Sequence, residues 1–239
     1  MTYSFLTCMG RDHMLHSGSN EDRVRIVSHD GVTTAVVCDG AGSFRAGSDA
    51  AAKTADILTE LLHRRFRELC TAPSADARKL ICEAVETSLH SLSRRMGIAA
   101  QELACTILAT AVHTDGRCLC VHLGDGIILQ KDKGNHRPSV VSCPMTGLVP
   151  HSTYLTMNCD LDRYLRFYRW ESDCLEQLLL LSDGAAEHLV RLQGGDGWVY
   201  TAGEMAFDAI RTRLLEANPR DDHSVVLISR KQEKEDTPQ

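Results

Sequence analysis

The hydrophobic pattern near the start of the chain predicts a β-hairpin. Residues Val24–Val27 alternate weakly between apolar and polar side chains, and Thr33–Cys38 is rich in β-branched residues, both of which are typical of strands. Asp30 and Gly31 lie between the two segments and form a turn signal. We therefore expect two antiparallel strands joined by a tight turn.

Two long helices are expected next. Between Ser48 and Leu69 apolar residues recur every three or four positions, so one face of a helix there would be apolar. Pro73 and Ser74 open a second stretch with the same period, which extends to about Met96. Gly97 follows it at the position where helices commonly stop.

The rest of the chain predicts mainly strands. They are expected over residues 104–113, 117–123, 127–131, 164–170, 177–182 and 223–229. Helices are expected near 185–192 and over 203–217, and residues 132–160 are expected to be irregular. Alternating strand–helix–strand units are absent, so the order favours an α+β fold, an antiparallel sheet or sandwich covered by helices. No linker divides residues 1–229, and the charged tail 230–239 is expected to be disordered.

Composition narrows the possible partners. The chain of 239 residues has 26 Lys and Arg against 32 Asp and Glu, a balance that argues against a nucleic-acid surface. No apolar run approaches the roughly 18 residues that span a bilayer, and the N-terminus does not resemble a signal peptide. The ten cysteines are scattered through apolar stretches without a C-x-x-C pair, which favours buried thiols in a reducing compartment. We expect a cytoplasmic protein with no membrane or nucleic-acid partner.

Acidic residues recur at the ends of the predicted strands. Asp39, Asp125 and Asp183 each end an apolar strand and precede a glycine, whereas Asp221 and Asp222 precede the last strand and Glu21 and Asp22 the first. Strands of one sheet bring their ends together, and carboxylates that meet there cannot all remain ionised without cations. Oxygen ligands select Mg²⁺ or Mn²⁺. By contrast, Asp30 and Asp115 are interpreted as ordinary turn residues.

Six motifs occur in a characteristic order. They are GxxHxxxGxxNED at Gly10–Asp22, VVCDGAGS at Val36–Ser43, ACTILAT at Ala104–Thr110, HLGDG at His122–Gly126, LLLLSDG at Leu178–Gly184 and RDDHSVVLI at Arg220–Ile228. From about residue 8 to 229 the chain resembles the metal-dependent protein phosphatase 2C family. Its DGAGS motif and the segment Tyr154–Thr156 are closer to those of a bacterial subgroup.

The resemblance implies a fold, a reaction and a ligand set. The fold would be a four-layer αββα sandwich of two antiparallel sheets flanked by helices, with a site for two Mn²⁺ or Mg²⁺ ions and a third, weaker one. The reaction would be hydrolysis of phosphoserine and phosphothreonine in proteins by a metal-bridging hydroxide. The phosphorylated protein would be the substrate, and a cognate Ser/Thr kinase is a further candidate partner. Residues 1–229 would form the catalytic domain.

Individual site residues follow from the motif positions. Asp39 would bridge two metals, the Gly40 carbonyl would bind one of them, and Asp183 and Asp221 would complete the other; Glu21 would bind directly or through water, supported by Asp22, and Asp125 would help to hold the third ion. The catalytic residues expected on this basis are Asp39, Asp183 and Asp221, together with His13 as the first candidate for binding phosphate.

Three departures from the family pattern leave alternatives open. Ser17 stands where many members have a phosphate-binding Arg, so Arg11, His13, His16 and Arg45 are the candidates to replace it. Ala41 stands where many members have a His that protonates the leaving group, so that proton would come from a metal-bound water or a nearby His. Asp222 replaces an Asn. Two other functions therefore remain: a catalytically weak phosphatase-like binding module, and an unrelated metal-dependent phosphohydrolase of small molecules.

Overall fold

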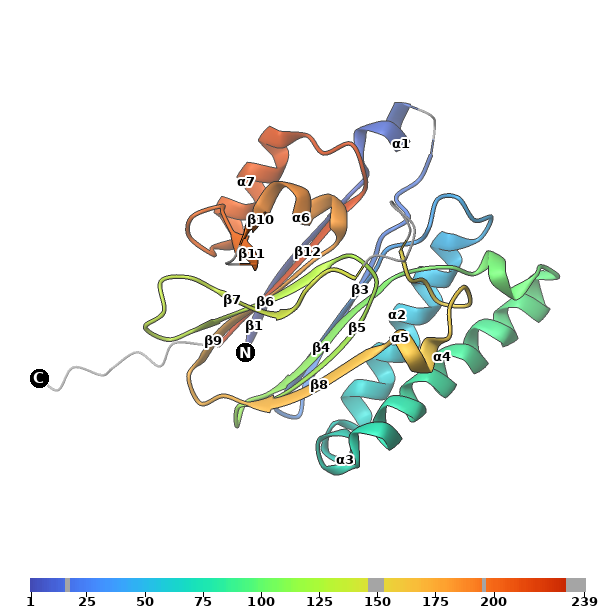
Figure 1. The fold of residues 1–239 in the computed structure, drawn as a ribbon, viewed down its shortest axis with the longest axis horizontal. Helices are drawn as coiled ribbons and strands as arrows, with labels where there is room; N and C mark the ends of the chain where they lie inside the picture. The colour runs from blue at the N-terminus through green and yellow to red at the C-terminus, as the bar shows by residue number, and fades with distance from the viewer. Residues whose placement is uncertain (16–17, 146–152, 195–196, 231–239) are drawn as a thin grey trace, which may run out of the picture.

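The computed structural model describes residues 1–15, 18–145, 153–194 and 197–230. Its main strands form two five-stranded antiparallel sheets that pack face to face, with helices on both outer sides (Figure 1). The helices between residues 47 and 164 cover one sheet, and those between residues 183 and 217 cover the other. The expected four-layer α+β sandwich is therefore confirmed.

The first sheet combines the two ends of the chain. Its strand order is β1 (Thr2–Cys8), β12 (His223–Ser229), β9 (Leu175–Leu181), β6 (Ile127–Asp132) and β7 (Ser139–Ser142). Helices α6 (Asp183–Leu189) and α7 (Phe207–Ala217) cover its outer face, and a small hairpin of β10 (Val190–Gln193) and β11 (Gly197–Tyr200) lies beside them (Figure 1).

The second sheet is a nearly sequential meander. Its strand order is β2 (Arg23–His29), β3 (Val32–Cys38), β4 (Ile107–His113), β5 (Arg117–Leu123) and β8 (Arg166–Glu171). The outer layer on this side contains α2 (Gly47–Arg64), α3 (Phe66–Thr71), α4 (Ser74–Met96) and α5 (Leu161–Tyr164), with a 3₁₀ turn at Ala100–Glu102. A short helix, α1 (Arg11–Leu15), follows β1.

Buried side chains alternate between two sides of each central strand. In β3, Val36 and Cys38 contact the helices of the outer layer, whereas Ala35 and Val37 contact the opposite sheet. In β9, Leu179 and Leu181 pack on α6 and α7, whereas Leu178 and Leu180 pack between the sheets. This double burial explains the uninterrupted apolar runs, because a strand covered on both faces has no polar side.

The predicted elements are mostly present, with the following main differences. Strand β1 was not expected; it is a half-exposed edge strand that pairs with β12 along its whole length. The expected helix 48–69 is interrupted at Arg65, although the apolar stripe continues through Phe66 into α3. The expected irregular segment 132–160 contains β7. The helix expected near 185–192 ends at Leu189, and β10 follows it.

Several smaller expectations are confirmed. Asp30 and Asp115 lie in the turns of the β2–β3 and β4–β5 hairpins. Gly97 ends α4 with φ of 66°, a left-handed conformation that glycine adopts at little cost. All ten cysteines are free; five are buried, but Cys143 and Cys174 are exposed, so the expectation of buried thiols holds only in part. No helix of the described residues is long and apolar enough to cross a membrane.

Candidate active site

Strand register brings the acidic residues to one end of the sandwich. In the first sheet, Leu181 at the end of β9 pairs with Ile127 at the start of β6 and with Val225 near the start of β12. In the second sheet, Ile107 at the start of β4 pairs with Leu123 at the end of β5. The residues that adjoin these positions include Asp39, Asp125, Asp183 and Asp221. Within each sheet, the strand pairing therefore places these carboxylates beside one another at the strand ends, as predicted from the sequence.

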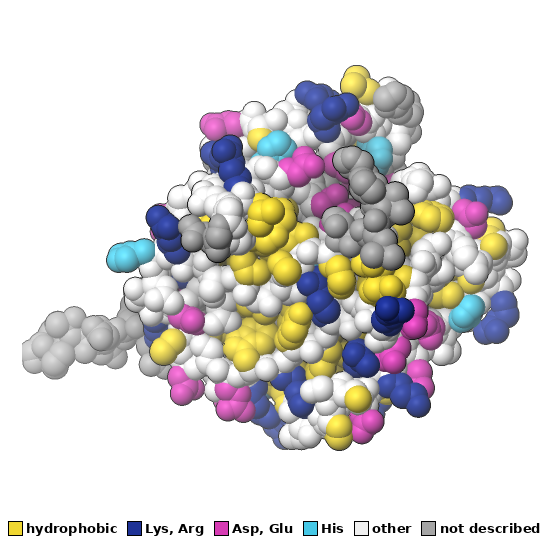
Figure 2. All heavy atoms as spheres, in the orientation of Figure 1, with side chains coloured by type: hydrophobic (Ala, Val, Ile, Leu, Met, Phe, Trp, Pro, Cys, Tyr) yellow, Lys and Arg dark blue, Asp and Glu magenta, His cyan; other side chains and the backbone are white. Residues whose placement is uncertain are grey.

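A cavity of about 490 Å³ opens at this end. Its lining includes Glu21, Asp39, Asp125, Asp221 and His13. Figure 2 shows acidic side chains gathered in the hollow between the two outer helical layers. Asp22, which is 2% exposed, and Asp183 do not line the cavity, but their charges act on the residues that do.

Mutual repulsion dominates the electrostatics of the carboxylates. Burial and the neighbouring Asp22, Asp183 and Asp221 raise the pKa of Asp39 well above its usual value. Burial, Asp125 and Asp221 raise the pKa of Asp183 to about 7. Burial and the carboxylates of Asp183 and Asp222 raise the pKa of Asp22 to about 7, although Ser224 and Ser182 partly oppose this. The raised pKa values of these three carboxyl groups show that their surroundings do not neutralise the repulsion.

Backbone contacts fix the loop after β3. The amide of Asp39 donates to the Thr106 hydroxyl at 3.0 Å, and the amide of Thr106 donates to the Asp39 carbonyl at 2.8 Å. A Cβ on Gly40 would lie 2.6 Å from the carbonyl carbon of Gly47, so only glycine allows the loop to pack against the start of α2. These contacts hold Asp39 at the cavity.

The HLGDG segment is fixed from a different part of the chain. The hydroxyl of Thr153 donates to a carboxylate oxygen of Asp125. Gly124, at φ of 109°, gives the chain the turn it needs between the two sheets. Burial and Asp221 raise the pKa of Asp125, while the Thr153 hydroxyl lowers it.

The N-terminal segment reaches the cavity through Asp222. This carboxylate is 3% exposed and accepts hydrogen bonds from the amides of Gly10 at 2.7 Å and Glu21 at 2.6 Å. Its Oδ2 atom also lies 3.0 Å from Nδ1 of His13. From the sequence this position was only a variation of the family pattern, because its partners are more than 200 residues away along the chain.

The candidate phosphate-binding residues separate in the structure. Of the candidates that the structure describes, only His13 lines the cavity; a Cβ on Gly42 would lie 3.8 Å from its Nε2 atom and 2.9 Å from Glu21 Oε2. Arg11 and Arg45 are exposed and do not line it. His16 and Ser17 lie outside the described residues, as do residues 146–152 of the segment 132–160 that was expected to be irregular. Thr106, Thr153 and Gly42 were not predicted as site residues, and their types carry no distinctive signal.

The donor set suits a divalent metal ion. Oε2 of Glu21 is shielded from water and has no hydrogen-bond partner within the described residues. Together with the repelling carboxylates, it offers the hard oxygen ligands that Mg²⁺ and Mn²⁺ prefer. Across the described residues, however, no group of three or more His, Cys, Asp or Glu side chains forms a metal site as it stands. The residues present therefore fit such ions chemically without a preformed coordination shell.

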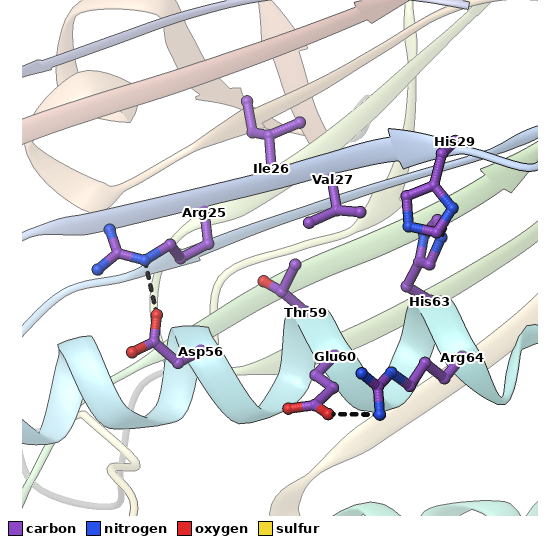
Figure 3. Close-up of a pocket in the computed structure, with 9 residues that line it drawn as sticks. All are labelled: Arg25, Ile26, Val27, His29, Asp56, Thr59, Glu60, His63 and Arg64. Atoms are coloured by element: carbon purple, nitrogen blue, oxygen red, sulfur yellow. Dashed lines mark hydrogen bonds and ion pairs between the residues drawn. The ribbon is translucent and has the colours of Figure 1, made fainter.

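A second cavity, of about 400 Å³, lies between β2 and α2 (Figure 3). Here opposite charges are paired: Arg25 with Asp56 at 2.6 Å, and Arg64 with Glu60 at 2.9 Å. The ring nitrogens of His29 and His63 approach to 3.0 Å. None of the expected site residues lines this cavity.

Comparison with known proteins gives one family and several similar folds. A family profile described as Protein phosphatase 2C matches residues 9–221. A bacterial serine phosphatase superposes with a TM-score of 0.67 at 15% identity, covering 98% of this chain and 99% of that one. The serine/threonine phosphatase Stp1 from Staphylococcus aureus gives 0.66 at 15% identity, covering 97% and 95%.

A third similar structure has a metal in its description. RsbX, crystallised in complex with magnesium, gives a TM-score of 0.59 at 10% identity and covers 94% of this chain and 92% of that one. At these identities the structural matches establish the fold alone. No curated protein sequence matches the chain.

Proposed function

Because the chain belongs to the protein phosphatase 2C family, we propose that it is a metal-dependent phosphatase of phosphoserine and phosphothreonine in proteins. One observation carries this proposal: carboxylates from both sheets converge on a single cavity in which their charges repel one another. Such an arrangement is costly unless cations enter it. Residues 1–229 would be the catalytic domain.

The metal ligands we propose are those at the motif positions. They are Glu21, Asp22, Asp39, Gly40 through its carbonyl, Asp125, Asp183 and Asp221. Bound Mn²⁺ or Mg²⁺ would supply a water-derived nucleophile near neutral pH and offset the charge of the phosphoryl group. Asp39 is central among these residues because its pKa responds to the charges of three of the others.

His13 is the residue we propose for binding the phosphate oxygens. Burial opposes its charged form, but Asp222, Glu21 and Asp221 outweigh burial and raise its pKa above the usual value. The ring is 31% exposed and lines the cavity, so a phosphate oxygen could reach it. An imidazolium there would supply the charge-assisted hydrogen bond that an arginine supplies in many relatives.

Phosphate release from a phosphothreonine peptide tests the proposal. We expect activity that requires Mn²⁺ or Mg²⁺, is abolished by EDTA and is lost in Asp39→Asn. Equal activity in EDTA would refute metal dependence. Phosphopeptide binding without turnover at millimolar Mn²⁺ would instead indicate a binding module. Much faster turnover of nucleotides or sugar phosphates than of phosphopeptides would indicate a small-molecule phosphohydrolase.

A further inference from the structure

Asp222 accepts two backbone amides, one on each oxygen, and has the ring of His13 at ion-pair distance. Oδ1 accepts the amide of Gly10, and Oδ2 accepts the amide of Glu21 and faces Nδ1 of His13. A carboxylate can accept at every lone pair, which matches this set of partners. Asp222 itself is too deeply buried to meet a substrate and does not line the cavity.

The position of Asp222 depends on the packing of α1 against the segment before β12. The amides of Arg11 and Asp12 donate to the carbonyls of Pro219 and Arg220, both at 3.0 Å. A Cβ on Gly10 would lie 2.2 Å from the carbonyl carbon of Asp221, so the two backbones are in direct contact. The distance between His13 and Asp222 is therefore set by backbone packing rather than by a flexible loop.

An asparagine would satisfy these partners less completely than the carboxylate does. If its oxygen took the place of Oδ2, its NH₂ group would face the amide of Gly10; in the opposite orientation it would face Glu21 and His13. Either orientation places a donor against a donor, which leaves a buried N–H unpaired. A carboxylate at position 222 therefore suits the two amides and the adjacent His13 ring better than an asparagine would.

We infer that Asp222 is a positioning residue that holds the His13 ring with Nδ1–H toward itself and Nε2 toward the cavity. This inference rests on the proposed function for the role of Nε2, which is to bind phosphate. Asp222 acts through His13, since it is His13 that lines the cavity. A carboxylate placed against one nitrogen of an imidazole fixes both the orientation of the ring and which nitrogen carries the proton.

Nitrogen NMR of the histidine rings tests the geometry without any measurement of activity. In the metal-free wild type at alkaline pH, His13 is expected as the Nδ1–H tautomer, and Asp222→Asn is expected to shift it toward Nε2–H. The signal is assigned by its loss in His13→Gln. A wild-type ring that is mainly Nε2–H would overturn the inference, whatever happens to the variants.

A double-mutant cycle tests whether Asp222 acts through His13. The measured quantity is the inhibition constant for inorganic phosphate in the Mn²⁺-loaded protein. We expect His13→Gln and Asp222→Asn each to weaken inhibition by about tenfold to a hundredfold, and the double variant to be no weaker than His13→Gln alone. Multiplicative effects, or normal inhibition by phosphate in a folded Asp222→Asn protein, would overturn it.

The chain offers a matched control in a second His–Asp pair. His113 Nδ1 lies 2.8 Å from Asp115 in the β4–β5 turn, and neither residue lines the cavity. Asp115→Asn should leave phosphate inhibition unchanged. If the wild type releases no phosphate from any phosphopeptide, the proposed function fails while the NMR result still decides the role of Asp222. If the enzyme is active but Asp222→Asn leaves the tautomer of His13 unchanged, the inference about Asp222 fails while the proposed function stands.

Discussion

The molecule has two cavities of similar volume, about 490 Å³ at the strand ends and about 400 Å³ between β2 and α2. They differ in how their charged side chains are arranged. At the strand ends, carboxylates from distant parts of the chain face one another. Between β2 and α2 each carboxylate has its own arginine, as Arg25 with Asp56 in Figure 3. Volume therefore does not distinguish the two cavities, whereas the balance of charge does.

The two arrangements differ in whether the charges need a ligand to neutralise them. Paired, half-exposed ions such as Arg25 and Asp56 contribute less than about 1 kcal/mol and need no further ligand. Unpaired carboxylates withdrawn from water cost stability until protons or cations neutralise them. We therefore place function at the strand ends, and each prediction below tests one side of this contrast.

The largest expected effect is on catalysis. Asp39→Asn should lower Mn²⁺-dependent phosphate release by at least about a hundredfold, because it removes the carboxylate on which the others converge. The matched substitution in the second cavity, Asp56→Asn, should leave the rate unchanged. Rates are measured with a phosphothreonine peptide. Similar losses in both variants would contradict the contrast between the cavities.

The next effect concerns the backbone beneath the first cavity. Gly10→Ala should cost about 1–3 kcal/mol of unfolding free energy and reduce phosphate release, because the added Cβ would meet the backbone of Asp221 at 2.2 Å. Gly134→Ala is the control: its surroundings are open, although its φ of 80° carries a local cost. Denaturant unfolding and phosphate release are measured for both. Full activity in a stable Gly10→Ala protein would show that this contact does not shape the site.

A third prediction concerns stability against pH without metal. The pKa values of Asp22 and Asp183 are about 7 in the folded protein, above the ordinary value of 3.8. The folded state therefore binds more protons between these values, and its stability should fall as pH rises from about 4 to about 7. Unfolding in EDTA across this range measures the slope, and millimolar Mn²⁺ should reduce it. A slope that is the same with and without Mn²⁺ would contradict cation binding.

The smallest effect is expected in the second cavity and has the opposite sign. Burial and His29 lower the pKa of His63, so protonation favours the unfolded state. Its contribution to stability is present above about pH 6.5 and is lost as pH falls below that value. His63→Gln should reduce this loss by less than about 1 kcal/mol, and His90→Gln, at an exposed position on α4, should not. If His63→Gln loses as much stability below pH 6.5 as the wild type does, the His29–His63 pair does not contribute to the pH dependence of unfolding.

Sequence patterns predicted the parts of the fold in which local and tertiary preferences agree. The apolar stripes of α2 and α4 and the runs of β3 and β9 marked buried elements because each side chain that packs is itself apolar. Strand β1 was not predicted because about half of its side chains face water, so its sequence contains no apolar run that indicates a strand. Its pairing with β12 depends on residues at the other end of the chain.

The candidate site divides in the same way. The ordered motifs indicated Asp39, Asp125, Asp183 and Asp221, because an acidic residue that directly follows or precedes an apolar strand is a local signal. Nothing local marked Asp222 as the acceptor for Gly10, Glu21 and His13. Similarly, sequence offered four candidates for binding phosphate with His13 as the first, and the cavity separates His13 from Arg11 and Arg45.

What the sequence determined by itself is the class of fold, the family and the set of acidic residues at strand ends, since these depend on periodicity and on motifs a few residues long. What only the tertiary structure decided is which charges share a space. Repulsion among carboxylates and the orientation of His13 both depend on distances between segments up to about 200 residues apart. Electrostatic energies vary with distance and burial, and neither quantity exists until the sheets have packed.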